Sequence, residues 1–287
     1  MTPPRPSPMT VAWLNPRQFD FIRDLIYEHS KITLEDCKND LVHSRLGKRL
    51  RALGLDSYDQ YCGLLRSADG GPELQFLIAA ISTNHTFFFR EEKHFEFLHN
   101  IAVPGMLSLV QRAKDRTLRV WSAASSSGEE PYSLAMLLNE HPGLAGPTSW
   151  ELAATDISHE ILRSAMAGIY DLDRIRNVPN QWFRRYFLLG KGSTANKCRI
   201  RPELQRKINF GQLNLFQPDY PFERPFHIIF CRNVMIYFNR QDRERLVARL
   251  HDCLVPGGYL MVGHSESLIG GQSAFETIQA AIYQKPL

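Results

Sequence analysis

The sequence lacks long apolar stretches and the usual metal and disulfide motifs. No run approaches a membrane span and the start, MTPPRPSP, has no apolar signal core, so we predict a cytoplasmic protein with a disordered lead over residues 1–12 and no membrane insertion. The five cysteines are odd in number and form no C-x-x-C pair, which favours free thiols. The ten histidines include no H-E-x-x-H motif, so we expect no metal.

Neither sign of charge is in strong excess. The net charge of +4 does not by itself indicate a nucleic-acid partner. A chain of 287 residues, 44% of them hydrophobic, can bury one large core or two smaller ones. We therefore predict a globular protein of two domains.

The first part of the chain has helical periodicity throughout. From Pro16 to about Ser82, apolar residues recur at spacings of three and four, and turn residues separate the runs. We predict a small all-helical domain over residues 13–88. Its stretch Leu41 to Leu55 has no acidic residue. It carries four basic ones: Arg45, Lys48, Arg49 and Arg51. Such a run is typical of a solvated helix face, and equally suits an acidic partner.

The rest of the chain is organised around Leu118 to Leu138, which predicts a strand, a tight turn and a helix. The turn consists of small residues ending at Gly128. Small residues let a ligand approach the backbone, where the first N–H groups of the helix are unpaired. The turn lacks the G-x-G-x-x-G pattern of dinucleotide folds, so an ordinary structural turn is the alternative.

Polar residues follow two other predicted strands. Trp150 to Ala154 leads into Asp156, where a carboxylate can accept from both hydroxyls of a ribose. Phe226 to Cys231 is a nearly continuous apolar run, typical of a strand buried on both faces, and it leads into Arg232 and Asn233. The alternation of strands and helices predicts a doubly wound, mainly parallel α/β sheet with its ligand at the switch point.

Three other segments complete the prediction. Gly168 to Phe210 breaks the alternation and is predicted to be an insertion. Tyr259 to Gly263 and Phe275 to Gln284 are predicted as the two final strands. Ser82 to Glu92 places three phenylalanines beside ligand-contacting groups, although a linker whose aromatic rings plug a seam is the alternative.

Together these motifs resemble one family. STNHTFFFRE, SAASSSGEEPYSLAMLL, ATDIS, NLNLF, FCRNVMIYFN and PGGYLMVGHSESL occur in the order seen in CheR-type chemotaxis receptor methyltransferases. The resemblance runs from about Asn15 to the end of the chain. It implies a Rossmann-like class I methyltransferase domain over residues 89–287 with a small antiparallel β-subdomain inserted at about 169–210. It also implies an S-adenosylmethionine-dependent enzyme that methylates receptor glutamates, sets receptor adaptation and releases S-adenosylhomocysteine.

The resemblance also implies site residues. Matched motif by motif, the cofactor contacts fall on Asn84, Thr86, Arg90, Glu129, Asp156, Asn214, Leu215, Arg232 and Asn233. Tyr237 is similar to the family's active-site tyrosine, and Arg90 is its predicted catalytic companion. We expect Arg90 on the cofactor's methionine carboxylate, partly orienting the substrate, and Tyr237 on the attacking carboxylate. Phe87, Phe88, Phe89 and Tyr237 are expected to exclude water.

The chemistry agrees with this interpretation. A glutamate with a pKa of about 4.3 is already ionised at neutral pH, so methyl transfer to it needs no general base. Attack of a carboxylate on a sulfonium removes both charges, which a dry site favours.

The resemblance predicts receptors as partners of a monomeric enzyme. The acidic methylation helices of such receptors complement Arg45, Lys48, Arg49 and Arg51. A receptor C-terminal pentapeptide is expected to add to the inserted sheet, near Gly190, Gly192, Arg199 and Arg201. Leu189 stands where an arginine is expected. Asn196 stands where a second loop glycine is expected, and asparagine tolerates positive φ.

Three alternatives remain. A nucleic-acid methyltransferase is disfavoured because we see no N-P-P-[YF]-type strand end and because the basic residues are confined to one helix. A hydrolase built on Gly263 to Ser267 would lack the second glycine of G-x-S-x-G. A catalytically inactive cofactor-binding regulator stays open.

Overall fold

The computed structural model describes residues 13–82, 85–114, 116–145, 148–268 and 274–287. The predicted lead, 1–12, lies outside these residues. The chain divides into two compact units, Met1–Thr83 and Asn84–Leu287. Within the described ranges, no helix has both the length and the apolar character needed to cross a bilayer.

The first unit is all-helical, as the periodicity predicts. Asn15 and Gln18 form a capping box at the start of the first helix, and Ile22, Leu46 and Leu77 are fully buried in the core. The elements are α1 Pro16–Ser30, η1 Asp36–Lys38, α2 Asn39–Ala52, α3 Tyr58–Arg66, η2 Ala68–Gly70 and α4 Gly71–Ile81.

The second unit is an α/β domain built on a seven-stranded sheet. Its main elements in chain order are α5 Glu92–Phe97, a π-helical turn η3 Leu98–Ala102, α6 Val103–Arg112, β1 Thr117–Ala123, α7 Glu129–Glu140, η4 Pro142–Leu144, β2 Ser149–Asp156, α8 His159–Ala167, β6 Ile208–Gln212, β7 Phe226–Cys231, η7 Met235–Tyr237, α11 Arg240–Asp252, β8 Leu254–Val262, β9 Glu276–Gln279 and β10 Ile282–Gln284. The predicted strand, turn and helix around Gly128 are thus β1, the turn and α7.

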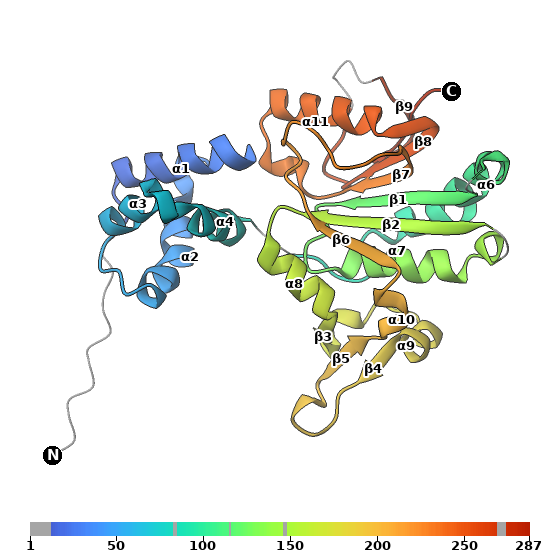
Figure 1. Ribbon diagram of the computed structural model, residues 1–287, viewed down its shortest axis with the longest axis horizontal. Helices are drawn as coiled ribbons and strands as arrows, with labels where there is room; N and C mark the ends of the chain where they lie inside the picture. The colour runs from blue at the N-terminus through green and yellow to red at the C-terminus, as the bar shows by residue number, and fades with distance from the viewer. Residues whose placement is uncertain (1–12, 83–84, 115, 146–147, 269–273) are drawn as a thin grey trace. The chain divides into compact units, whose positions relative to one another are not determined.

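The strand order places the switch point at β1. The sheet has the order β6-β2-β1-β7-β8-β10-β9 (Figure 1). β6, β2, β1, β7 and β8 are mutually parallel, whereas β10 is antiparallel to β8 and β9. The chain builds outward from β1 on one side and then crosses to β7 on the other, which opens a crevice at the carboxyl ends of these strands.

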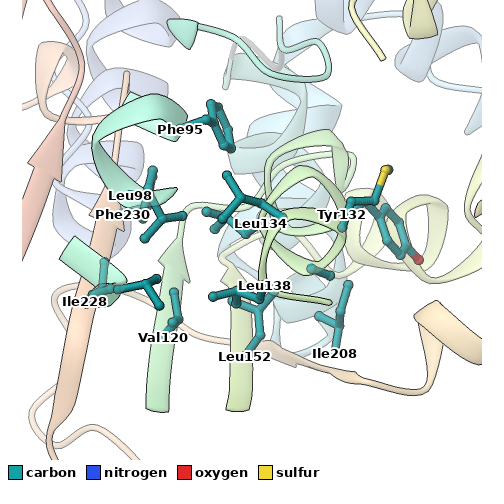
Figure 2. Packing of buried hydrophobic residues seen from close by; sticks show 14 of the residues in the cluster. Phe95, Leu98, Val120, Tyr132, Leu134, Leu138, Leu152, Ile208, Ile228 and Phe230 are labelled. Atoms are coloured by element: carbon teal, nitrogen blue, oxygen red, sulfur yellow. The ribbon is translucent and has the colours of Figure 1, made fainter. Parts of the chain in front are cut away.

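Helices cover the sheet with an apolar core between. Leu134 and Leu138 of α7 pack over Val120, Leu152 and neighbouring strand residues (Figure 2). The four named side chains are 0% exposed, so α7 is fixed against the sheet and its first turn is fixed with it.

The last predicted strand, Phe275 to Gln284, is in fact two strands. β9 and β10 form a hairpin, and Ala281 in the turn between them has a φ of 62°. A left-handed residue reverses the chain, and this conformation cannot be recognised from an alanine in a strand-like run.

The insertion forms a second, antiparallel sheet. Its elements are β3 Ile169–Asp171, η5 Leu172–Ile175, α9 Asn180–Tyr186, β4 Phe187–Leu189, η6 Gly192–Thr194, β5 Lys197–Ile200 and α10 Pro202–Gln205. The strand order is β3-β5-β4, and the sheet lies apart from the seven-stranded sheet (Figure 1). The inserted sheet ends before Ile208, because Ile208–Gln212 is β6 and pairs with β2.

Candidate functional site

The turn between β1 and α7 lies at the carboxyl edge of the parallel strands. The backbone N–H of Ser125 donates to the carbonyl of Thr155 at 2.8 Å, which joins the turn to the end of β2. Ala124, Ser126 and Gly128 all have positive φ. A Cβ on Gly128 would lie 2.8 Å from the hydroxyl of Tyr170, so only glycine fits there. Left-handed residues concentrated in one turn indicate a functional site.

Asp156 is held at this edge by two backbone donors. Its Oδ2 accepts from the N–H of Ser126 at 2.8 Å, and its Oδ1 accepts from the N–H of Ser158 at 3.0 Å. The side chain is buried, and burial raises its pKa although the backbone N–H groups oppose the rise. Each oxygen keeps a lone pair for a further donor, as recognition of a diol requires.

Glu129, the first residue of α7, is fully buried beside the same turn. The hydroxyl of Ser127 donates to its Oε2 at 2.6 Å, and the Nη2 of Arg174 lies 2.8 Å from its Oε1. Glu130 takes another direction and accepts from Ser122 and from Arg232. The two consecutive glutamates therefore belong to different clusters.

Arg232 follows β7 and is almost completely buried. Its guanidinium lies 3.0 Å from Glu91 and 3.1 Å from Glu130, and it donates to the carbonyl of Arg90. The sequence predicted a cofactor contact here. This stays a prediction; in the structure the guanidinium lies in an ionic cluster that joins the segment preceding α5 to the end of β7. Neither Glu91 nor Glu130 was singled out from the sequence, because no local motif marks them.

Asn233 and Glu266 shape the loop that follows β7. Asn233 has a φ of 58°, and the carboxylate of Glu266 accepts from the N–H groups of Asn233, Ile236 and Gly263. The segment Gly263 to Ser267, weighed as a hydrolase motif, thus contributes a carboxylate that organises backbone.

Three possible metal ligands also gather here, although the sequence shows no ligand spacing. Glu91, His94 and His264 each offer one possible ligand atom, and these three atoms lie within 4.8 Å of one another. Burial, aided by Arg232, lowers the pKa of His94 to about 3. The carboxylate of Glu91 already has a cationic partner here, since the guanidinium of Arg232 lies 3.0 Å from it.

The other residues predicted to contact the cofactor differ in how deeply they are buried. Leu215 is buried and Asn214 is partly buried after β6, where its side chain caps a turn by accepting from the N–H of Phe216 at 2.9 Å. Thr86 and Arg90 are partly buried, and the Nη1 of Arg90 donates to the carbonyl of His85 at 2.7 Å. Asn84 lies outside the described residues.

The residues expected to exclude water divide between core and surface. Phe88 is fully buried against Tyr170 and Phe187 of the inserted sheet, and Phe89 packs on Trp182. These two rings therefore anchor the insertion. Phe87 and Tyr237, in contrast, are partly exposed.

The polar atoms at the edge fit a bound polar ligand. The Oγ atoms of Ser125 and Ser126 and the Oε1 of Glu129 are buried, yet none has a hydrogen-bond partner among the residues that the structure describes. Buried polar groups are normally paired, so three such atoms around one turn point to a ligand that supplies donors and acceptors. Asp156 lies against the same turn through its bond to Ser126.

The predicted basic surface on α2 is smaller than its sequence suggests. Arg45 donates to the carbonyls at the end of α4, and Arg49 forms a two-pronged ion pair with the buried Glu73, at 2.6 Å for the shorter contact. Both therefore stabilise the helical unit. Lys48 and Arg51 are exposed and are the remaining cations of the helix for a partner.

The predicted peptide-binding hairpin joins β4 to β5. A Cβ on Gly190 would lie 2.0 Å from the carbonyl oxygen of Thr194, and Gly192 has a φ of 58°. Asn196 does not have a positive φ, and its carbonyl accepts from the N–H of Leu172. Leu189 and Arg199 are exposed, whereas Arg201 is partly buried.

A mainly parallel sheet in this order, with acidic side chains at its carboxyl edge, defines a class I methyltransferase fold that binds S-adenosylmethionine. Residues 84–284 match the model described as CheR methyltransferase, SAM binding domain, and residues 17–82 match its all-alpha domain. The chain belongs to the CheR methyltransferase family.

Curated relatives support this assignment over most of their length. The chemotaxis protein methyltransferase of Salmonella typhimurium is 41% identical over 88% of this chain and 85% of its own. That of Escherichia coli K12 has the same identity and coverage, and that of Borreliella burgdorferi is 37% identical over 91% of both chains.

Proposed function

We propose that this protein transfers the methyl group of S-adenosylmethionine to glutamate side chains of chemotaxis receptors and thereby sets receptor adaptation. The observation that supports this best is the set of buried polar atoms around the turn after β1, next to Asp156, that have no hydrogen-bond partner among the described residues, in a family of S-adenosylmethionine-binding chemotaxis methyltransferases. The cofactor supplies an activated methyl group. The substrate glutamate supplies a nucleophile that is ionised without a base.

Within this proposal the acidic residues bind the cofactor. Asp156, fixed by two backbone donors, accepts from the ribose hydroxyls. Glu129 adds a second buried acceptor at the start of α7. The ionic cluster of Arg232, Glu91 and Glu130 holds the surrounding segments in place. Cofactor binding thus depends on groups that the fold positions before the ligand arrives.

Arg90 and Tyr237 act where the substrate carboxylate meets the cofactor. The guanidinium of Arg90 holds the methionine carboxylate and partly orients the substrate. A tight ion pair to the attacking carboxylate would weaken the nucleophile, so the neutral hydroxyl of Tyr237 is the better partner for it. Both side chains are only partly buried, as residues that meet an incoming protein substrate must be.

The receptor contacts follow from the two surfaces described above. Lys48 and Arg51 face acidic methylation helices, since exposed charges mainly steer encounter. An edge strand of the β3-β5-β4 sheet accepts a receptor C-terminal peptide as an added strand. Arg199 then lies near the acidic residues of that peptide.

One experiment tests the function against its alternatives. The protein is incubated with methyl-labelled S-adenosylmethionine and a receptor cytoplasmic fragment, and the labelled product is treated with mild base. A carboxyl methyl ester is released by base, whereas an N-methyl group on nucleic acid or protein is retained. Release of the label from the receptor fragment supports glutamate methylation. Cofactor binding without transfer to that fragment would instead favour an inactive regulator.

A further inference from the structure

Arg174 of the insertion reaches back into the turn of the main domain. It lies in η5, immediately after β3, and its Nη2 is 2.8 Å from the Oε1 of Glu129. The same atom is 3.5 Å from the Oγ of Ser127 and 3.4 Å from the carbonyl oxygen of Thr86. One guanidinium therefore touches both segments in which the cofactor contacts are expected.

Glu129 needs such a partner because its carboxylate is fully buried. Burial raises its pKa, and the hydroxyl of Ser127, Arg174 and His85 oppose that rise. Tyr170 also faces it, with its hydroxyl bonded to the carbonyl of Ser127. Of these groups, Arg174 is the permanent cation in direct contact.

The ion pair leaves Glu129 able to bind a ligand. Although the Nη2 of Arg174 is close, the Oε1 of Glu129 has no hydrogen-bond partner within the described part of the chain. The pair is thus held by charge and not by an aligned hydrogen bond. A donor on a ligand can take the free acceptor position while Arg174 keeps the carboxylate ionised.

The insertion also supports the turn mechanically. The hydroxyl of Tyr170, on β3, donates to the carbonyl of Ser127 at 2.7 Å and lies 2.8 Å from the position that a Cβ on Gly128 would take. Phe88, beside the predicted cofactor segment, packs on Tyr170 as well. The inserted sheet is therefore built into the wall of the site.

We infer that Arg174 is a positioning residue for cofactor binding, which keeps Glu129 ionised and aimed at a donor group of S-adenosylmethionine. This inference rests on the cofactor placement in the proposed function. It gives the insertion a task inside the catalytic domain that is separate from any peptide binding at its outer edge. It also predicts that the side chain acts through its charge, so lysine should replace it better than glutamine.

The test measures the affinity for S-adenosylhomocysteine by calorimetry between pH 6 and 9 for the wild type and for Arg174→Gln, Arg174→Lys and Arg176→Gln. Arg176 is the matched control, since it is exposed, lies in the same segment and pairs only locally with Asp173 among the described residues. At pH 7, Arg174→Gln should weaken binding by about three- to tenfold, a range set by the partial exposure of the Arg174 side chain. Arg174→Lys and Arg176→Gln should bind nearly as the wild type does.

The pH dependence of the affinity distinguishes a role of the Arg174 charge from a purely structural role of this side chain. Without Arg174 the pKa of Glu129 rises further, so more of it is protonated at low pH and the deficit relative to wild type should grow as the pH falls. The ratio to wild type cancels the titration of the ligand itself. A ratio near one at every pH would overturn the inference. So would an equal deficit at every pH that lysine does not rescue, because that pattern indicates a structural role.

Two further variants separate this inference from the proposed site. Glu129→Gln and Asp156→Asn should each weaken binding if the cofactor lies at this edge. If neither does, the cofactor placement itself is wrong and the inference about Arg174 is lost with it. If both weaken binding while Arg174→Gln has no effect, the placement stands and only the inference is refuted.

Discussion

The Oδ2 of Asp156 accepts a hydrogen bond from the backbone N–H of Ser126 at 2.8 Å, so the end of β2 and the turn after β1 form one rigid edge. Because Asp156 is buried, its replacement affects both the ligand site and the turn. The structure shows that alanine would leave two backbone donors unpaired.

Asp156→Asn is therefore the sharper test of cofactor binding. It removes the charge from the hydrogen bonds to the ligand, each worth about 1.5–3 kcal/mol. It keeps the size of the side chain and one of the two backbone hydrogen bonds, since its single amide oxygen can accept from the N–H of Ser126 or of Ser158 but not from both. Affinity for S-adenosylhomocysteine should fall by about tenfold or more in calorimetry. Asp219→Asn, on an exposed loop, is the control. Unchanged affinity of the Asp156 variant would remove this residue from the cofactor site.

Tyr237→Phe should affect turnover more than cofactor affinity. The hydroxyl is proposed to contact the attacking carboxylate, and loss of one neutral hydrogen bond in the transition state corresponds to about 0.5–1.5 kcal/mol, or up to about tenfold in rate. Single-turnover methyl transfer and calorimetry with S-adenosylhomocysteine measure the two quantities separately. A variant that methylates at the wild-type rate would exclude Tyr237 from the mechanism.

Lys48→Glu combined with Arg51→Glu should slow association with a receptor fragment. Exposed charges act mainly on the encounter rate, so the rate should also become less sensitive to salt. Stopped-flow association at several ionic strengths measures this, with Arg112→Glu on α6 as the control. If rate and salt dependence stay at their wild-type values, α2 is an ordinary solvated helix.

Arg45 should not be included in that charge reversal. Its guanidinium donates to the carbonyls of Ala80, Ile81 and Ser82, and a carboxylate in its place would leave these acceptors without that donor. We expect Arg45→Glu to lower the melting temperature of the helical unit, whereas the Lys48 and Arg51 changes leave it unaltered. Differential scanning calorimetry compares them, and equal melting temperatures would contradict the structural role of Arg45.

An acidic receptor pentapeptide with an aromatic C-terminal residue should bind the inserted sheet in the micromolar range, about −8 kcal/mol. Strand addition draws its affinity from backbone hydrogen bonds, so the departures at Leu189 and Asn196 should change preference without abolishing binding. Titration of the peptide into the full chain, beside one that lacks the aromatic residue, measures this. No heat at millimolar peptide would show that the protein does not use this tether.

Acid should destabilise the protein partly through His94. Its pKa is about 3 in the folded state and near 6.5 when unfolded, so protons bind preferentially to the unfolded chain. Its contribution to stability is complete above about pH 6.5 and declines as the pH falls toward 3. Relative to His94→Gln, the wild type should therefore lose melting temperature over this interval. The exposed His159→Gln is the control, and a pH-independent difference between wild type and His94→Gln would refute the assignment.

The sequence by itself determined the helical first unit, the parallel sheet and the placement of Glu129 and Asp156. These features depend on local patterns: helical periodicity, buried strand runs, and the fact that parallel strands end at one edge. The same local reasoning could not tell that Phe275 to Gln284 reverses at Ala281, since a left-handed alanine carries no sequence signal.

Only the tertiary structure decided which charged side chains are paired within the protein and which remain available to a partner. Arg45 and Arg49 belong to one basic run with Lys48, yet packing of α4 against α2 ties them to carbonyls and to Glu73. Arg174 meets Glu129 from 45 positions away in the chain. Long side chains reach whatever the fold places within a few ångströms, and the sequence records only their identity. The physical reason is that such pairings depend on the packing of distant segments.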